Sequence, residues 1–312
     1  METKKANSFF LFIMILLIIC QLILGIVLKH FNVPTYLWTD FVEYGALLIP
    51  SIIYLVVTKR PIKETLKLKL LSVKNILILI VIFFLSVPLM AALGAVSQLF
   101  FHNYVSDAMQ GMKGLSYFFM MVTIAVTPAI CEETLMRGVV LSGYRNVDIR
   151  KAAIMNGFLF GLFHLGAQQF FYAFALGIVF VYVVEITGSI FASMICHFLI
   201  NGFSTTIAWL SMKYIPNYLS KTAEISRNSS SSLITGVIFW CILALIFTPL
   251  LVIVIKELDI INGGRLSQRK KMQLIQEKDF NEEKVMSWPV YAIIVLYIGF
   301  MIVAQLLGHA RV

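Results

Sequence analysis

The chain has 312 residues, of which 60% are hydrophobic and only 13% are charged, and its mean hydropathy is +0.89. These values exclude an ordinary soluble domain and predict an all-α, polytopic membrane protein built as a transmembrane helical bundle. The net charge of +9 does not indicate a nucleic-acid partner, because the basic residues lie in short segments between apolar runs, where they orient the chain in the lipid bilayer.

Apolar runs recur along the whole chain. They occupy approximately residues 8–28, 38–57, 75–100, 116–140, 152–167, 169–186, 189–210, 233–255 and 288–308. Most are long enough to cross a hydrocarbon core of about 30 Å at about 1.5 Å per residue, although the fifth and sixth are short and closely spaced. We therefore expect about nine spans, with eight as the alternative.

The basic residues predict the topology. Lys4 and Lys5, the segment 59–69, the stretch 145–151 and the loop 265–271 all fall on one side if the spans alternate. Because Lys and Arg favour the cytoplasmic side, we expect a multi-pass protein of the cell membrane with its N-terminus in the cytoplasm. With about nine spans, the C-terminus lies outside.

Three parts follow from these runs. The sequence predicts N-terminal transmembrane spans at residues 1–115, a central part at 116–210 that contains the polar motifs described below, and C-terminal spans with a basic cytoplasmic loop at 211–312. The basic residues of that loop either set the topology or also touch anionic lipid headgroups. No disulfide framework is expected, because all four cysteines lie in apolar segments: Cys20, Cys131, Cys196 and Cys241.

The fourth apolar run contains two adjacent glutamates and an arginine. Ionisable groups cost at least a few kcal/mol each in hydrocarbon, so they persist mainly where they pair or line a wet cavity. At about 100° per residue, Glu133 and Arg137 share a helix face and can pair, whereas Glu132 points to a neighbouring face and stays available. Pro128, one turn before Glu132, is expected to bend the helix and open space beside the carboxylates. A purely structural ion pair is the alternative.

The fifth run contains a histidine beside closely spaced glycines. Phe160 and His164 are four residues apart and share a face. Gly157 and Gly161 form a G-x-x-x-G pair, which lets a neighbouring helix approach closely and would bring His164 within reach of another span. A hydrogen-bonding bridge between helices is the alternative role for this histidine.

The seventh run adds His197 and Asn201, again four residues apart and on one face. These side chains can bind a metal or stabilise an oxyanion; alternatively they join helices through hydrogen bonds worth about 0.6 kcal/mol each. A free carboxylate, an imidazole, and an imidazole with a carboxamide together supply a general base, a group that polarises water and an oxyanion site. The combination therefore predicts hydrolysis.

Taken together, the three motifs resemble those of a known family. Glu132-Glu133-x-x-x-Arg137, Phe160-x-x-x-His164 and His197-x-x-x-Asn201, in this order and on separate spans, are similar to the motifs of the CPBP intramembrane proteases. That family includes the type 2 CAAX prenyl endopeptidases and bacterial Abi proteins. The resemblance covers roughly residues 116–210, and one departure is Met136, where bacterial relatives commonly carry phenylalanine.

The resemblance implies a role for each motif residue. It implies that Glu132 and His164 activate water and that two further residues hold the tetrahedral oxyanion, namely His197 and Asn201. Glu133 and Arg137 then support the site, in agreement with the helical-face argument.

Whether a cofactor takes part is left open by the residues. Zinc favours about three protein ligands plus a water molecule, and Glu132, His164 and His197 would supply them if a divalent metal such as zinc is used. A metal-free mechanism needs the same groups. Cys131 and Cys196 adjoin motif residues, but neighbouring helix positions diverge by about 100°, so we expect them to pack rather than to join the site.

The remaining acidic residues and histidines of the spans are not expected to act directly in catalysis. Asp40 and Glu43 are expected near the outer end of the second span, where water reaches them. Glu185, near the cytoplasmic end of the sixth span, is a weaker candidate for a supporting contact. Three histidines are expected near outer span ends without a catalytic part: His30, His102 and His309.

These observations predict an intramembrane endopeptidase whose substrate is a membrane-associated peptide or protein that reaches the site from the lipid or the cytoplasm. A prenylated C-terminus is one substrate that the resemblance implies. The first alternative is a non-catalytic membrane scaffold or bacteriocin-immunity protein, although binding alone does not require Glu132, His164 and His197 together. The second is a proton-coupled transporter, which predicts two related halves with broken helices, and the sequence has no such repeat.

Overall fold

The structure is a computed structural model that describes residues 2–31, 35–101, 103–215, 230–276 and 284–306. All regular elements in these residues are helices, which confirms the all-α prediction. Of the three histidines expected at outer span ends, His102 and His309 lie outside the described residues, and His30 is exposed near the end of the first helix.

Seven spans in the described residues are long and apolar enough to cross a membrane. They comprise α1 (Thr3–Phe31); α2 (Thr35–Val42), η1 (Glu43–Leu48) and α3 (Ile49–Val57); α5 (Val73–Gln98); α7 (Tyr117–Met121), η2 (Val122–Val126), α8 (Thr127–Glu133) and η3 (Thr134–Val140); α10 (Ala167–Thr187); α11 (Phe191–Tyr214); and α13 (Ser230–Ile261).

The remaining helices are shorter: α4 (Ile62–Thr65), α6 (Tyr104–Gly111), α9 (Ile149–Phe163), α14 (Arg265–Gln276) and α15 (Trp288–Leu306). Helices α9 and α15 coincide with predicted apolar runs but fall short of the seven spans in length or hydropathy. The transmembrane bundle is therefore as predicted, and the expected count of eight or nine spans is approximate.

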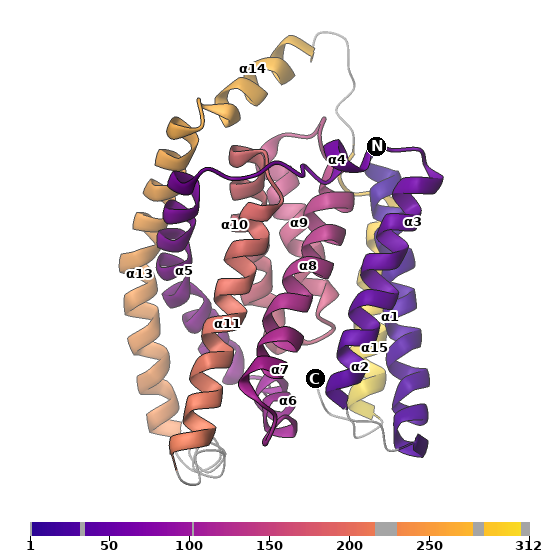
Figure 1. Ribbon diagram of the computed structural model, residues 1–312, viewed down its shortest axis with the longest axis vertical. Helices are drawn as coiled ribbons and strands as arrows, with labels where there is room; N and C mark the ends of the chain where they lie inside the picture. Colours follow the sequence, from indigo (N-terminus) through magenta and orange to yellow (C-terminus); the bar gives the residue numbers. More distant parts are fainter. Residues whose placement is uncertain (1, 32–34, 102, 216–229, 277–283, 307–312) are drawn as a thin grey trace.

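The long helices stand side by side in Figure 1, with α5 and α13 at one edge and α1, α2, α3 and α15 at the other. Helices α8, α9, α10 and α11 occupy the middle. The three sequence motifs lie on α8 and η3, at the end of α9, and on α11. Apolar side chains of α1, η3 and α9 form one buried cluster, and those of α5, α10, α11 and α13 form a second. The motif residues thus lie between these two buried clusters of apolar side chains.

Several helix boundaries follow from the local sequence. Ser72 accepts the Asn75 N–H at 3.3 Å through its side chain and starts α5. Asp148 accepts the Arg150 N–H at 2.9 Å and starts α9. Both are side chains that satisfy free amides at helix N-termini. Helix α10 ends at Gly188, whose φ of +67° is the left-handed conformation that favours glycine.

Helices α9 and α10 pack closely because glycines line their contact. A Cβ atom at Gly157 would lie 2.6 Å from the carbonyl oxygen of Phe174, and one at Gly161 would lie 2.8 Å from the ring of Phe170. Real side chains cannot approach so closely, so this spacing depends on glycine. The expectation that the G-x-x-x-G pair admits a neighbouring helix is confirmed, and the neighbour is α10.

The basic segments meet at one end of the bundle, where α4 and α14 lie in Figure 1. Glu185 binds both Lys67, at 2.5 Å, and Arg269 of α14, at 2.8 Å. Arg269 also donates to the carbonyls of Tyr144, at 2.8 Å, and Val147, at 3.0 Å. Burial lowers the pKa of Lys67, and the Glu185 carboxylate opposes this shift. That this end faces the cytoplasm stays a prediction.

Candidate active site

Glu133, Arg137 and His197 form the centre of the polar cluster. Arg137 Nη1 donates to Glu133 Oε1 at 3.0 Å, and His197 Nδ1 lies 2.9 Å from the same oxygen. Because Glu133 is paired with a guanidinium and accepts, His197 Nδ1 carries the proton and donates. All three side chains are buried. The predicted Glu133–Arg137 pair is present, and it also joins α8 to α11 through His197.

Two aromatic rings enclose the Arg137 guanidinium. Its Cζ atom lies 4.3 Å from the centroid of the Phe160 ring and 5.0 Å from that of Phe180. Cation–π contacts of this kind stabilise a desolvated cation by about 2 kcal/mol. Phe160 belongs to the second motif, whereas Phe180 on α10 was not singled out by sequence reasoning, because an isolated phenylalanine in an apolar run carries no distinguishing signal.

Glu132 lies beside this cluster with an unengaged oxygen. It is only 6% exposed, and its Oε2 atom has no hydrogen-bond partner in the described part of the chain. His197 Nε2 is 4.0 Å from that oxygen, which is too long for a hydrogen bond. The sequence expectation that Glu133 pairs while Glu132 stays available therefore agrees with the geometry.

His164 ends α9 and is partly exposed. Its Nδ1 atom lies 2.9 Å from the Phe160 carbonyl oxygen, which only accepts, so Nδ1 carries the proton and Nε2 keeps its lone pair in the neutral ring. The Phe160 ring centroid is 4.8 Å from that of His164 and 6.1 Å from that of His197. Phe160 thus links the second motif to the first and third.

Asn201 is held by a backbone carbonyl. Its Nδ2 atom donates to the oxygen of Ile124 at 3.0 Å. Ile124 lies four residues before Pro128, which has no N–H to donate to it, in a stretch that forms the wide π-helical turns of η2. The second amide hydrogen of Asn201 stays available for another acceptor.

The π-helical segment after α8 is supported in a similar way. Asn156 on α9 donates its side-chain amide to the carbonyl oxygen of Met136 in η3, at 2.9 Å. Single π-helical turns inside helices are frequent at functional sites. The helix that carries Glu132 is therefore bounded on both sides by wide turns, each of which receives an asparagine amide from another helix.

Two acidic residues of the second span also face the span that carries Glu132. Asp40 and Glu43 lie near the start of the second span and are partly exposed, as the sequence predicts. Asp40 Oδ2 accepts the Thr123 hydroxyl at 2.8 Å, and the Glu43 carboxyl group lies close enough to that of Glu132 for the two to interact electrostatically. The prediction placed them by depth alone, which ignores the face they present. Two acidic residues three apart in an apolar run were a usable signal, because such groups persist mainly at polar contacts.

The candidate metal ligands do not form a site that is ready for an ion. Within the residues that the structure describes, no group of three or more His, Cys, Asp or Glu side chains is arranged to hold a metal. His197 directs Nδ1 to Glu133, and its Nε2 is 4.0 Å from Glu132. We therefore derive no step through a metal.

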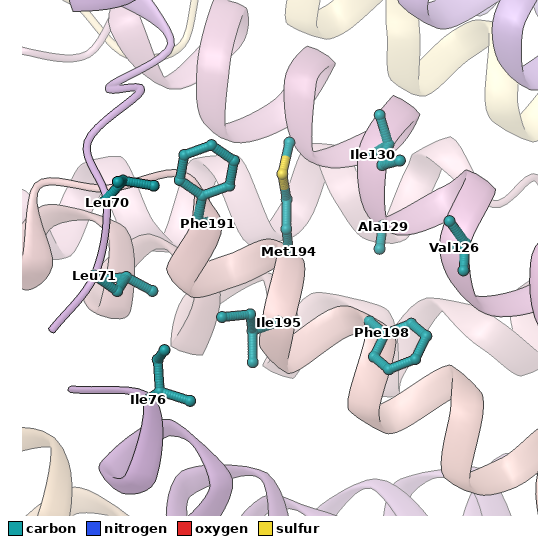
Figure 2. Close-up of a pocket in the computed structure, with 10 residues that line it drawn as sticks. All are labelled: Leu70, Leu71, Ile76, Val126, Ala129, Ile130, Phe191, Met194, Ile195 and Phe198. Carbon is teal, nitrogen blue, oxygen red and sulfur yellow. The ribbon is translucent and has the colours of Figure 1, made fainter. Parts of the chain in front are cut away.

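An apolar pocket of about 410 Å³ is lined in part by the helices that carry Glu132 and His197. Figure 2 shows that its side chains come from the 70–76 segment, from the η2–α8 helix and from α11. Ala129 and Ile130 precede Glu132 by less than one helical turn, while Met194 and Phe198 lie on the helix of His197. The pocket and the polar cluster thus share two helices.

Comparison with known proteins agrees with the motif analysis. Residues 114–203 match the family model described as Type II CAAX prenyl endopeptidase Rce1-like, and this segment contains all three motifs. Neither the curated proteins nor the solved structures give a match. The family points to a protease, and the apolar helices place it in a membrane. The predicted resemblance is confirmed: the segment 114–203, which is less than half of the chain, is similar to the type II CAAX prenyl endopeptidase Rce1-like family.

Proposed function

We propose that this protein is an intramembrane endopeptidase in which Glu132 acts as the general base toward water. The observation that carries the proposal is the buried Glu132 carboxyl group, whose Oε2 atom has no hydrogen-bond partner in the described chain and faces His197 Nε2 at 4.0 Å. A buried carboxylate oxygen without a partner is costly, so a polar reactant accounts for its persistence.

The reaction begins with a water molecule that attacks the scissile carbonyl carbon while Glu132 takes its proton. His164 Nε2, which keeps a lone pair because Nδ1 donates to Phe160, accepts a hydrogen bond from the same water. The carbonyl π bond breaks and a tetrahedral oxyanion forms. When the C–N bond then breaks, Glu132 returns the proton to the leaving amine.

His197 and Asn201 supply the proposed oxyanion site. His197 donates through Nδ1 to Glu133, so a second donation, from Nε2 to the oxyanion, requires the doubly protonated imidazolium. Asn201 donates one amide hydrogen to Ile124 and offers the other to the oxyanion. Preorganised donors of this kind are worth about 2.7–4 kcal/mol each in related hydrolytic chemistry.

The substrate proposed is a membrane-associated peptide or protein with an apolar segment next to the scissile bond. The pocket in Figure 2 is lined entirely by apolar side chains and lies beside the helices that carry Glu132 and His197. Such a lining favours an apolar segment over a polar one.

The test is comparative peptidomics of membranes and medium from cells that carry the wild type, Glu132→Gln or no copy of the protein. Glu257→Gln is the matched control, since Glu257 is an exposed carboxylate on α13. Specific fragments should vanish equally in the deletion and in Glu132→Gln, with normal amounts of the variant protein, and remain in Glu257→Gln. Fragments that persist in Glu132→Gln would instead support a non-catalytic scaffold or immunity protein.

A further inference from the structure

Two lysines lie next to the residues that form one end of the apolar pocket. Figure 2 shows Leu70 and Leu71 at one end of the pocket and Val126 at the other. Lys69 directly precedes this leucine pair, and Lys74 follows it by three residues at the start of α5. Both lysines are exposed. One end of an otherwise apolar site therefore adjoins positive charge.

This positive charge has no acidic counterpart in the same segment. Residues 65–76 contain three lysines and no aspartate or glutamate. Of the three, Lys67 pairs with Glu185 at 2.5 Å. Neither Lys69 nor Lys74 forms an ion pair within the part of the chain that the structure describes. Two ammonium groups thus remain to attract an anionic group.

Hydrogen bonds fix the backbone that carries the two lysines. Ser189, in the turn before α11, donates its hydroxyl to the carbonyl of Lys69. Next to Lys74, the side chains of Asn75 and Asn262 donate to each other at 3.0 Å and join the start of α5 to the end of α13. The lysines are therefore anchored at defined positions beside the pocket.

The apolar lining and the two charges together define the ligand that fits. An apolar segment gains free energy by leaving water along the lining, and an anionic group at its end gains more by reaching the ammonium groups. The other end of the pocket favours the chain to be cleaved over a lipid tail, because Ala129 and Ile130 lie within one helical turn of Glu132. The charge is therefore expected on the substrate.

We propose that Lys69 and Lys74 are specificity-determining residues, which bind an acidic side chain of the substrate next to the apolar segment in the pocket. This assignment rests on the proposed function for its consequence in hydrolysis. The attraction of an acidic peptide to this end of the pocket does not depend on catalysis and is tested separately.

The first test uses synthetic peptides and needs no cleavage. Each peptide has blocked termini and a photoreactive leucine in an apolar segment, flanked on one side by two aspartates, two asparagines or two lysines. Wild-type protein in phosphatidylcholine nanodiscs should be labelled at the pocket residues, about fivefold more by the aspartate peptide than by the asparagine peptide. High salt should remove this preference, because exposed charges are screened. Mass spectrometry locates the labelled residues.

Variants identify the origin of the preference. Lys69→Gln combined with Lys74→Gln should abolish it. The matched control combines Lys113→Gln with Lys270→Gln, which removes the same charge from exposed lysines elsewhere and should keep the preference. Lys69→Glu combined with Lys74→Glu should favour the lysine peptide, which also shows that the pocket is intact.

Two results of the labelling overturn the proposal. One is equal labelling of the wild type by the aspartate and asparagine peptides. The other is loss of the aspartate preference when phosphatidylglycerol is added to the nanodiscs, because Lys69 and Lys74 then bind anionic lipid headgroups instead of a peptide.

The second test uses the substrate identified by peptidomics. Lys69→Gln combined with Lys74→Gln should raise KM about fivefold at unchanged kcat. Replacing the acidic residue that flanks the substrate's apolar segment by its amide should raise KM equally in the wild type and add nothing in the double variant. Additive effects of the two changes would exclude direct pairing.

The outcomes separate this proposal from the proposed function. If Glu132→Gln cleaves at the wild-type rate while the aspartate preference is present, the protease mechanism fails and the lysine site stands. If Glu132→Gln is inactive while the wild type shows no preference, the lysines have no part in specificity and the protease function stands.

Discussion

Asn201 on α11 donates its side-chain amide to the backbone carbonyl of Ile124, at 3.0 Å. This is the carbonyl to which the residue at position 128 would donate in a regular α-helix, and that residue is proline. Asn201 thus compensates for the missing backbone donor and at the same time ties α11 to the helix that carries Glu132.

This relationship predicts a coupled effect on stability. Asn201→Leu leaves the Ile124 carbonyl without the amide and should lower the free energy of unfolding by about 1 kcal/mol. Pro128→Ala restores a backbone donor, so the double variant should lose less than the sum of the two single changes. Unfolding of the four proteins in one detergent measures the coupling, and simple additivity would contradict it.

The enclosure of Arg137 predicts that a conservative exchange is not tolerated. Arg137→Lys keeps the charge but loses the planar group that lies between the rings of Phe160 and Phe180 and pairs with Glu133. We expect a loss of about 2 kcal/mol in unfolding free energy, because a compact ammonium is a poorer partner for a buried carboxylate.

The control for Arg137 is Lys5→Gln. Lys5 pairs with Glu2 at 3.2 Å, but its side chain is 63% exposed, so this change should cost little. Equal stability of Arg137→Lys and the wild type would show that the cation–π enclosure is unimportant.

The orientation of His164 predicts a kinetic effect of its own. His164→Ala removes the ring that directs Nε2 away from the Phe160 carbonyl, and kcat should fall about 10²-fold or more if this nitrogen holds the reacting water. His30→Ala, on an exposed histidine of α1, is the matched control and should keep full activity. A small loss in His164→Ala, comparable to the control, would remove this residue from the mechanism.

The apolar pocket predicts an effect on substrate affinity rather than on chemistry. Phe198→Ala widens the pocket and should raise KM about tenfold, equivalent to about 1.4 kcal/mol of lost apolar contact, with little change in kcat. Phe239→Ala removes an exposed phenylalanine of α13 and serves as the control. A fall in kcat at constant KM would contradict a role in substrate binding.

The contacts of Arg269 predict an effect on the local stability of α14 rather than on catalysis. Its guanidinium binds Glu185 and the carbonyls of Tyr144 and Val147, so Arg269→Gln should increase hydrogen exchange in α14. The neighbouring Lys270 is exposed, and Lys270→Gln should leave exchange unchanged. Equal protection of α14 in the two variants would mean that Arg269 does not anchor this helix.

Much of the fold was predictable because apolar runs and helical spacing are local properties of the sequence. The pairing of Glu133 with Arg137, and the availability of Glu132, followed from about 100° of rotation per residue. The approach of α10 to Gly157 followed from the G-x-x-x-G pair. These features depend on one helix or on two neighbouring ones.

The contacts that sequence reasoning missed join segments far apart in the chain. Phe180 encloses Arg137 from another helix, and Glu43 reaches Glu132 from a span that carries none of the motifs. Depth along the span was predictable for Glu43, which is partly exposed, but the wide turns of η1 and the packing of that span set the face it presents. Tertiary packing decides which face of a helix meets which neighbour. The spacing of residues within one helix carries no information about that packing.

The most direct test of the account is hydrolysis of the identified substrate by the purified protein in oxygen-18 water. Mass spectrometry of the fragments should show cleavage at one position with a single oxygen-18 atom in the new C-terminal carboxylate. Glu132→Gln should show no cleavage although it is folded, while Glu257→Gln should match the wild type. Cleavage by Glu132→Gln at the wild-type rate would contradict the assignment of Glu132 as the base that activates water.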